Sequence, residues 1–468
     1  MNNKYFIFPL LIAFTLILFS CEKEAVDPNK PDLSEEVLIL NNWIWEGMND
    51  VYLWADQLPN LDPEYQLDPK QYFYDLLYSE DRNSWIEEDY EALIARFSGV
   101  SLSTGMSVDP GRIDSFQVVS VVEYVTPGSP ASDAGIERGD IIIAIDGQSL
   151  NTDNYYSLYY QTTASFEFGD WDGSEMIANE KKVSLTSIEL NKNPIVYHEL
   201  IEYQGKKIGY MVYTQFTKGK EGEWLEELNS VFEEFKNAGV SDMVVDLRYN
   251  PGGSLDLSAY FASTLGPATA MNNNNVFVNL VWNQAYNEFW KKYDFDQDGE
   301  ADGENSVQLV IKLAQSDYNL NMSTVYFLTT GGTASACESL MTGLYPYLDV
   351  VQIGTTTYGK PYGSITIDDW EEPKRHKWAM QPIVLKYANA DGFTDFVNGI
   401  DPDYLVEEKV LYLEPFGNMN DPMLAKALER ITGVSPSMKG LRMPDDAFKS
   451  MPEPPNRMIE RSISLPGK

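Results

Sequence analysis

The alternation of strand-like and helical stretches between residues 195 and 432 constrains the fold of this 468-residue chain most strongly. Short apolar runs typical of buried strands lie at 207–216, 243–247, 324–328 and 350–353. Stretches with helical spacing lie between or beside them, at 224–235, 255–265 and 336–345. This alternation indicates an α/β domain built on a largely parallel sheet.

The segments on either side of this region have a different character. Residues 34–97 predict a small helical domain, because apolar residues recur mostly at three- and four-residue steps: Val37, Leu40, Trp43, Ile44, Met48, Val51 and Tyr52. The aromatic pattern continues through Trp85, and such a stripe is more often core than a ligand site. Residues 433–468 are rich in Met, Pro, Ser and Lys without periodicity, which predicts a poorly ordered tail.

Residues 98–190 predict a β domain. A strand-like run at 117–122 is followed by a Pro-Gly turn, a short helix, an apolar strand at 141–145 and an Asp-Gly hairpin turn. The string GSPASDAGIERGDIIIAIDGQSL resembles a PDZ domain. The resemblance implies that a peptide's free C-terminus adds as an edge strand, with backbone amides holding its carboxylate.

Some residues of this PDZ-like domain are candidates for the peptide-binding groove. The carboxylate-binding loop is expected before the first strand, in the region of Gly99 and Gly105, and Tyr155, Leu158 and Tyr159 are candidates for the groove helix. The alternative is a PDZ-like domain that serves only as a packing module, since fold alone does not fix function.

The first twenty residues, MNNKYFIFPLLIAFTLILFS, have the shape of a signal peptide and are too short for a comfortable membrane span. The following Cys21 completes a sequence, LFSC, that resembles a bacterial lipobox. This resemblance implies a lipoprotein signal peptide at 1–20, a lipidated Cys21 and a tether at 21–33. The expected location is the cell envelope, at the outer membrane with the facing left open; the alternative is an ordinary signal peptide that ends near a cysteine.

The composition excludes several classes of protein. Asp and Glu number 71 against 34 Lys and Arg, and the net charge of −37 argues against nucleic acid or an anionic membrane surface as partner. Two Cys exclude a disulfide-dense scaffold and a Cys-rich zinc module, and we expect Cys337 to be core. No G-x-S-x-G elbow is present, so a Ser-His-Asp site is disfavoured, and His198 and His376 are expected to be structural or exposed.

Two glycine-rich motifs carry the functional signal: DLRYNPGG at 246–253 and GGTASACES at 331–339, with TYGK downstream at 357–360. Their order and spacing, after a PDZ-like domain, resemble the carboxy-terminal processing (tail-specific) serine peptidases, in a bacterial lipoprotein form. The resemblance implies a multidomain α/β protein: an N-terminal helical domain, a PDZ-like β domain and a crotonase-like α/β peptidase core at 191–432. It also implies a serine endopeptidase that acts near the C-terminus of proteins or peptides.

The same resemblance implies which residues form the catalytic site. Ser335 is the implied nucleophile and Lys360 the implied general base, and the backbone amides of Gly252, Gly253 and Ala336 would hold the oxyanion. The family commonly has Gln four residues after the lysine, whereas this chain has Ser364, so Ser364 or another group would orient the base.

Elementary chemistry agrees with these roles. Ser335 stands where a strand leads into a helix, and a helix N-terminus favours developing negative charge. A lysine can act as a base only when it is neutral, so burial must lower its pKa. Taken singly, NPGG is more often a turn, a serine before a helix is more often a cap, and a lysine is usually solvated. Only the combination favours catalysis.

Two other functions stay open at this stage. A non-catalytic peptide-binding or scaffolding lipoprotein could use the same fold. A third hypothesis is a crotonase-type acyl enzyme, but the sequence has no recognisable coenzyme-binding signature. No cofactor is required by the predicted chemistry. The sequence DFDQDGEAD at 294–302 nevertheless resembles a calcium loop, with Asp294, Asp296, Asp298 and Asp302 as candidate ligands; the alternative is a solvated acidic loop.

Overall fold

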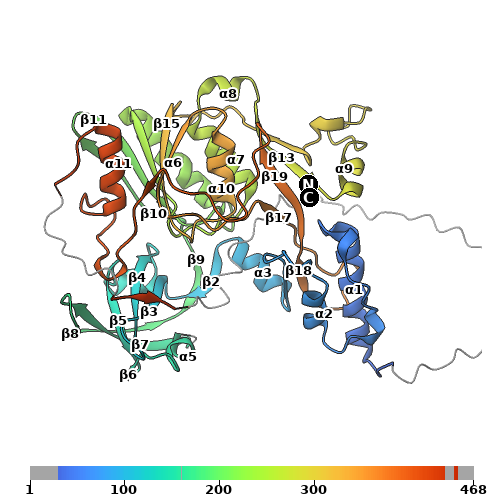
Figure 1. Cartoon of the computed structure of the whole chain (residues 1–468), viewed down its shortest axis with the longest axis horizontal. Helices are drawn as coiled ribbons and strands as arrows, with labels where there is room; N and C mark the ends of the chain where they lie inside the picture. Colours follow the sequence, from blue (N-terminus) through green and yellow to red (C-terminus); the bar gives the residue numbers. More distant parts are fainter. Residues whose placement is uncertain (1–29, 160, 438–446, 452–468) are drawn as a thin grey trace, which may run out of the picture.

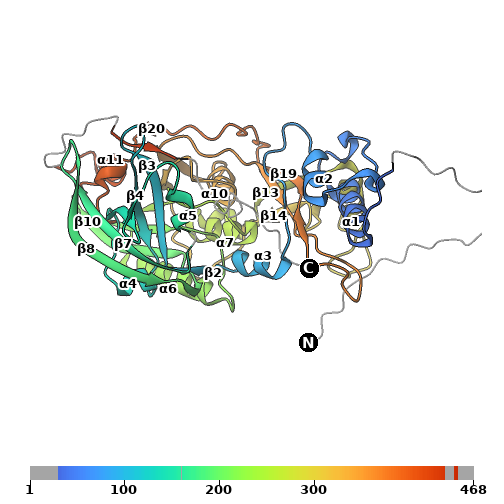
Figure 2. The same ribbon diagram turned by 90° about the horizontal axis from the view of Figure 1, so that it is seen from below.

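A computed structural model describes residues 30–159, 161–437 and 447–451. The predicted signal peptide, Cys21 and most of the tether therefore lie outside the described residues. Within the described ranges, none of the helices combines the length and the apolar character that a bilayer span requires. Figures 1 and 2 show the PDZ sheet and the N-terminal helices at opposite ends of the long axis, and in Figure 1 the α/β core lies above the PDZ sheet.

The N-terminal part is helical, as predicted. Its helices are α1 (Glu35–Val51), η1 (Ala55–Gln57), η2 (Pro63–Tyr65), α2 (Pro69–Asp75) and α3 (Tyr90–Phe97). Ser34 caps α1, because its hydroxyl accepts the Val37 N–H, and the apolar stripe of the helix buries Trp43, Ile44 and Met48.

The prediction that Trp85 continues the helical pattern is wrong, because Trp85 lies in a strand. This strand, β1 (Trp85–Glu87), pairs antiparallel with β18 (Ala379–Gln381) and so attaches the N-terminal part to the core. A pairing with a strand almost 300 residues away leaves no local periodicity in the sequence.

The PDZ part is one antiparallel sheet with two short helices. The sheet contains β3 (Met106–Arg112), β4 (Val118–Val125), β5 (Ile141–Ile145), β6 (Gln148–Ser149), β7 (Thr163–Trp171) and β8 (Met176–Thr186), with α4 (Pro130–Asp133) and α5 (Tyr155–Tyr159). Gly105 stands immediately before β3, where the carboxylate loop was expected. Gly99 instead precedes β2 (Val100–Ser103), which pairs with β9 (Ile188–Asn191) in a separate two-stranded sheet.

The core is a six-stranded sheet in the order β10-β11-β12-β15-β16-β20. All of its pairs are parallel except β10 with β11. The strands are β10 (Ile195–Tyr203), β11 (Lys206–Tyr213), β12 (Asp242–Asp246), β15 (Thr324–Thr329), β16 (Asp349–Gly354) and β20 (Tyr404–Leu405). One apolar cluster joins this sheet to α6 (Glu223–Ala238), α7 (Leu255–Leu265) and α10 (Ala336–Leu344), and a second cluster joins it to α11 (Pro422–Thr432). Helices therefore cover both faces, and the prediction of an α/β domain with a largely parallel sheet is confirmed.

A second, antiparallel sheet packs beside the core and was not predicted. Its strands are β14 (Val310–Lys312), β13 (Val276–Trp282), β19 (Ile383–Asn389) and β17 (Tyr362–Ser364), accompanied by α8 (Ala268–Asn272), α9 (Gln284–Trp290) and the short turn η3 (Gly303–Asn305). The short turn η4 (Val410–Tyr412) packs instead against the PDZ sheet. The second sheet positions the site because β17 directly follows the segment that carries Lys360.

The prediction of a poorly ordered C-terminal tail is wrong in part. Residues 447–451 are ordered against the PDZ sheet, where β21 (Lys449–Ser450) pairs antiparallel with β3. A two-residue strand has no pattern that a sequence window can detect, which is why a poorly ordered tail was predicted. Residues 438–446 and 452–468 lie outside the described residues.

Candidate functional site

Ser335 occupies a strained position at the start of α10. Its backbone has φ 63° and ψ −112°, a left-handed conformation that a residue with a Cβ rarely adopts. The side chain is fully buried, and its Oγ has no hydrogen-bond partner among the residues that the structure describes. Strain of this kind costs roughly 1–3 kcal/mol and clusters at functional sites, as do buried hydroxyls without partners.

Lys360 lies in the segment between β16 and β17 and is only 1% exposed. Burial lowers the pKa of its ammonium to about 7, while the carboxylates of Asp81 and Glu338 oppose that shift. A substantial fraction of Lys360 is therefore neutral near pH 7, which is the form that accepts a proton.

The buried carboxylate of Glu338 joins the two positions. Its Oε2 accepts the N–H groups of Ser335 and Lys360, both at 2.8 Å. Its Oε1 accepts the Thr357 hydroxyl at 2.6 Å and the Gly359 N–H at 2.7 Å. Burial raises the pKa of Glu338, and these four donors act in the opposite direction.

The hydroxyl of Tyr387, on β19, makes a second connection. Its Oη lies 2.9 Å from the Ser335 carbonyl oxygen and 2.8 Å from that of Lys360. Burial raises the pKa of Tyr387 well above its usual value, so the hydroxyl keeps its proton and donates it to these carbonyls. The backbones of Ser335 and Lys360 are thus fixed relative to each other from both sides.

The NPGG turn lies against Ser335. Asn250 holds the turn by donating to the Tyr213 carbonyl at 2.9 Å and accepting the Gly252 N–H at 2.8 Å. Gly252 has φ 111°, and a Cβ there would lie 2.7 Å from Ser335 Cβ and 3.0 Å from Ala336 N. Only glycine permits this close approach. Gly253 is the next residue of the same turn.

The other predicted residues fall into two groups. Ser364 lies buried on β17, four residues after Lys360, and Cys337 lies in the core with its Sγ donating to the Asn250 carbonyl at 3.2 Å. His198 instead lies on β10 beside Glu234, and His376 packs edge-on against Trp43 of α1. Neither histidine contacts Ser335 through any interaction found in the described residues.

Three residues of the site were not predicted: Glu338, Tyr387 and Asp81. Glu338 could have been found, because Ser-x-x-Glu before a helix has the spacing of a capping box. The contributions of Tyr387 and Asp81 depend on tertiary packing, which no local motif reports.

A cavity of about 740 Å³ extends from the PDZ part to the NPGG turn. At one end it is lined by β3 residues, by Gly105 and by Tyr155 and Tyr159 of α5, and at the other by Pro251 and Gly332. Predicted groove residues and the NPGG turn therefore share one continuous space.

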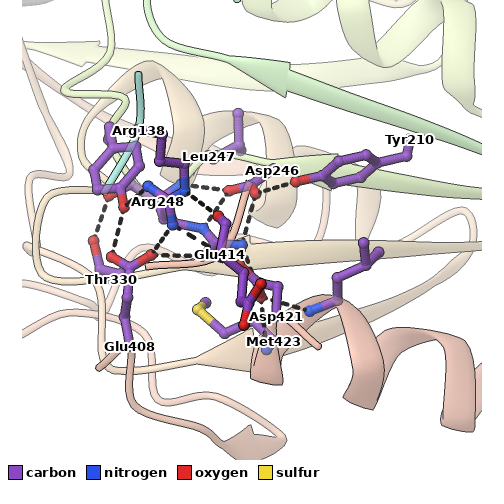
Figure 3. A network of polar contacts seen from close by, with 12 residues as sticks. Arg138, Tyr210, Asp246, Leu247, Arg248, Thr330, Glu408, Glu414, Asp421 and Met423 are labelled. Atoms are coloured by element: carbon purple, nitrogen blue, oxygen red, sulfur yellow. Dashed lines mark hydrogen bonds and ion pairs between the residues drawn. The ribbon is translucent and has the colours of Figure 1, made fainter. Parts of the chain in front are cut away.

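Figure 3 shows the polar network that borders this cavity. Arg248, fully buried, donates to Asp246 at 2.8 Å, to Glu408 at 2.6 Å and to Asp421 at 2.8 Å. Arg138, from the PDZ part, donates to the same Glu408 at 2.6 Å and to the Tyr249 hydroxyl at 2.6 Å. Burial raises the pKa of Glu408, but the two guanidinium groups outweigh it and hold that pKa at about 2. The PDZ sheet is thereby docked beside the NPGG turn.

The proposed calcium loop is partly assembled. Carboxylate oxygens of Asp294, Asp296 and Asp302 lie within 4.8 Å of one another, whereas Asp298 is not part of this group. The backbone N–H of Asp298 donates to both Asp294 and Asp296 at 3.2 Å.

Comparisons with known proteins agree with this architecture. The family model of peptidase family S41 matches residues 207–406, that of the peptidase S41 N-terminal domain matches 40–98, and that of the PDZ domain matches 121–163. The chain belongs to peptidase family S41. The fold is that of an S41 peptidase core with an N-terminal domain and a PDZ domain.

Individual relatives of this S41 chain are named as proteases. A carboxyl-terminal-processing protease of Picosynechococcus is 31% identical over 36% of this chain and 39% of the relative. The carboxy-terminal processing protease CtpA of Bacillus subtilis is 25% identical over 60% of this chain and 52% of the relative. The chain thus spans about half or less of these two relatives.

A crystal structure of a Bacteroides fragilis protein assigned to the S41 proteases matches with a TM-score of 0.69 and 26% identity. The match covers 84% of this chain and 98% of that one.

The calcium hypothesis is tested by titrating the chain with Ca²⁺ in a calorimeter and by measuring its melting temperature with and without a chelator. If three carboxylates bind the ion, Ca²⁺ raises the melting temperature, and Asp294→Asn with Asp296→Asn abolishes the increase because two anionic ligands are lost. Absence of heat and of any chelator effect would identify a solvated acidic loop.

Proposed function

We propose that this S41 chain is a serine endopeptidase that cleaves proteins or peptides near their C-terminus, with Ser335 as nucleophile and Lys360 as general base. One observation carries the proposal. A buried hydroxyl on a strained backbone belongs to the same hydrogen-bonded unit as a desolvated lysine whose pKa is about 7. A lysine with that pKa is suited to accept a hydroxyl proton at neutral pH.

The chemical steps follow from these groups. Neutral Lys360 Nζ takes the proton of Ser335 Oγ while Oγ attacks the scissile carbonyl carbon, which forms a tetrahedral oxyanion. The Lys360 ammonium then gives the proton to the leaving amine, and water, activated by the same lysine, hydrolyses the acyl enzyme. Ser364 would help to orient Lys360 from β17.

Backbone amides would stabilise the oxyanion. The Ala336 N–H stands at the N-terminus of α10, where the helix dipole favours negative charge. The Gly252 N–H donates to Asn250 in this structure, so it serves the oxyanion only after that bond is exchanged. Gly253, which follows it, is the alternative donor from the same turn.

The PDZ domain would capture the substrate tail. The free C-terminus would add as a strand to β3, with its carboxylate at the loop that ends at Gly105. The cavity that continues from this groove to Pro251 and Gly332 offers a route for the preceding residues of the substrate to the site.

The catalytic assignment is tested with casein and with a tail peptide. Ser335→Ala and Lys360→Ala are each expected to lower kcat by about 10³-fold or more, because nucleophile and base act as one unit. Ser339→Ala is the matched control: Ser339 is equally buried on α10, one turn further along, and its loss should leave the rate nearly unchanged.

Cleavage at the wild-type rate by Ser335→Ala would contradict the assignment. Tight peptide binding with no cleavage by the wild type would favour a non-catalytic scaffold.

We also propose that Cys21 carries lipid and anchors the exported chain to the cell envelope, at the outer membrane. The support is the apolar leader and the lipobox-like LFSC sequence. Expression in a bacterium fed radiolabelled palmitate should label the wild type and place it in the membrane fraction. Cys21→Ser should be unlabelled, because no thiol remains to be acylated. Equal labelling of both, or of neither, would contradict the anchor.

A further inference from the structure

A segment of the chain itself lies along the groove strand of the PDZ domain. β21 pairs antiparallel with β3, so that Lys449 lies opposite Arg112 and Ser450 lies opposite Gly111. Without β21, β3 would be the edge of its sheet, because the order is β21-β3-β4-β5-β7-β8. A free sheet edge is the surface that strand addition uses.

The pairing continues beyond β21. The Met451 N–H donates to the Pro110 carbonyl at 2.7 Å, and Ser450 Oγ donates to Asp109 Oδ2 at 3.0 Å. Because Pro110 has no N–H, its position suits the edge of the sheet, where only its carbonyl is used.

Two apolar side chains anchor the segment, one on each face of the sheet. The Phe448 ring lies directly over Gly111, where a Cβ would collide with it, and packs against the cluster that contains Val119 and Ile141. Met451 packs on the opposite face, against the core of the PDZ domain. Strand addition with side chains held in apolar pockets is how such grooves bind peptides.

The direction of the segment is that expected of a substrate tail. β3 runs away from Gly105 towards Arg112, and an antiparallel partner therefore runs towards Gly105, where a carboxylate is expected. Ser450 and Met451 also line the cavity that leads to Pro251 and Gly332. One edge of β3 cannot pair with two strands at the same positions.

Connectivity favours this occupant. The segment is joined to α11 by residues 434–446, and tethers of this length give effective concentrations of about 1 mM. Even a weakly binding segment therefore competes with dilute substrates.

We propose that residues 447–451 are an intramolecular occupant of the substrate-tail groove, which a substrate tail must displace before β3 can accept it. The proposal rests on the proposed function of that groove. Occupancy lowers the apparent affinity for tails in proportion to the fraction of chains whose groove is open.

The test measures binding of a fluorescent synthetic peptide with the sequence of residues 444–451 and a free carboxylate. The host is the full chain carrying Ser335→Ala, so that the peptide is not cut. Adding Phe448→Asp with Met451→Asp removes both anchors, and the Kd for the peptide should fall by about tenfold or more. Val434→Asp with Ser437→Asp is the matched control: it introduces the same two negative charges in the same tail, at two exposed residues outside the groove. Equal Kd values for the Ser335→Ala host and for the host with both anchor substitutions would overturn the proposal. The segment would then serve only to stabilise the fold.

Hydrogen exchange on the Ser335→Ala chain provides a second readout that does not depend on how the double variant folds. Saturating peptide should remove the protection of the Met451 N–H in the chain's own segment, and unchanged protection would overturn the proposal. The two hypotheses are separable through cleavage. With Ser335 present, the anchor variant should lower KM for casein while kcat changes less than about twofold. If the anchor variant binds the peptide more tightly than its host but the wild type cleaves no substrate, the proposed protease activity is refuted while the inference about the groove is supported.

Discussion

The carboxylate of Glu338 holds the candidate site together, because one buried side chain connects the start of α10 with the segment 357–360. It accepts N–H groups from Ser335, Gly359 and Lys360, and the hydroxyl of Thr357 completes its shell. Each of these N–H groups would otherwise be buried without a partner, at a cost of about 1–3 kcal/mol apiece. The position of Glu338 in the first turn of α10 also suits a carboxylate, since the helix N-terminus carries partial positive charge. The backbone is thus fixed while Ser335 Oγ takes no part in holding it.

The N-terminal domain contributes to the electrostatics of Lys360, the proposed base, as well as to packing. Asp81 raises the pKa of Lys360 against the larger effect of burial, and it is held by the Tyr52 hydroxyl at 2.8 Å. The adjacent Arg82 donates to the Gly359 carbonyl at 2.8 Å, directly before Lys360. Burial alone would lower the pKa of a lysine further, so the opposing carboxylates determine that it lies near neutrality. A domain that looks like a packing element in sequence therefore helps to set the pKa of Lys360.

Much of the architecture could be predicted because the residue pattern within each segment indicates its secondary structure. The helix at 255–265 and the core strands have the apolar spacing of buried elements, and the glycine motifs mark the turns around Ser335. The second sheet, the β1–β18 pairing and the β21–β3 pairing could not be predicted, since each joins short strands that are far apart in the sequence. The same limit applies to the site. Ser335 and Lys360 carry a motif, whereas Tyr387 and Asp81 act only through the positions that folding gives them.

The pH dependence of covalent labelling tests the central claim, that Ser335 is activated by a desolvated Lys360. The full chain is treated with a fluorophosphonate at pH 5 to 10, and the modified serine is identified by peptide mass spectrometry. Because the neutral lysine is the active form, the labelling rate of Ser335 should rise with pH through a midpoint near 7, the pKa to which burial lowers Lys360. Lys360→Met should lose both the fast rate and the midpoint. A midpoint near the ordinary lysine pKa of about 10.4, or labelling unchanged in Lys360→Met, would contradict the account.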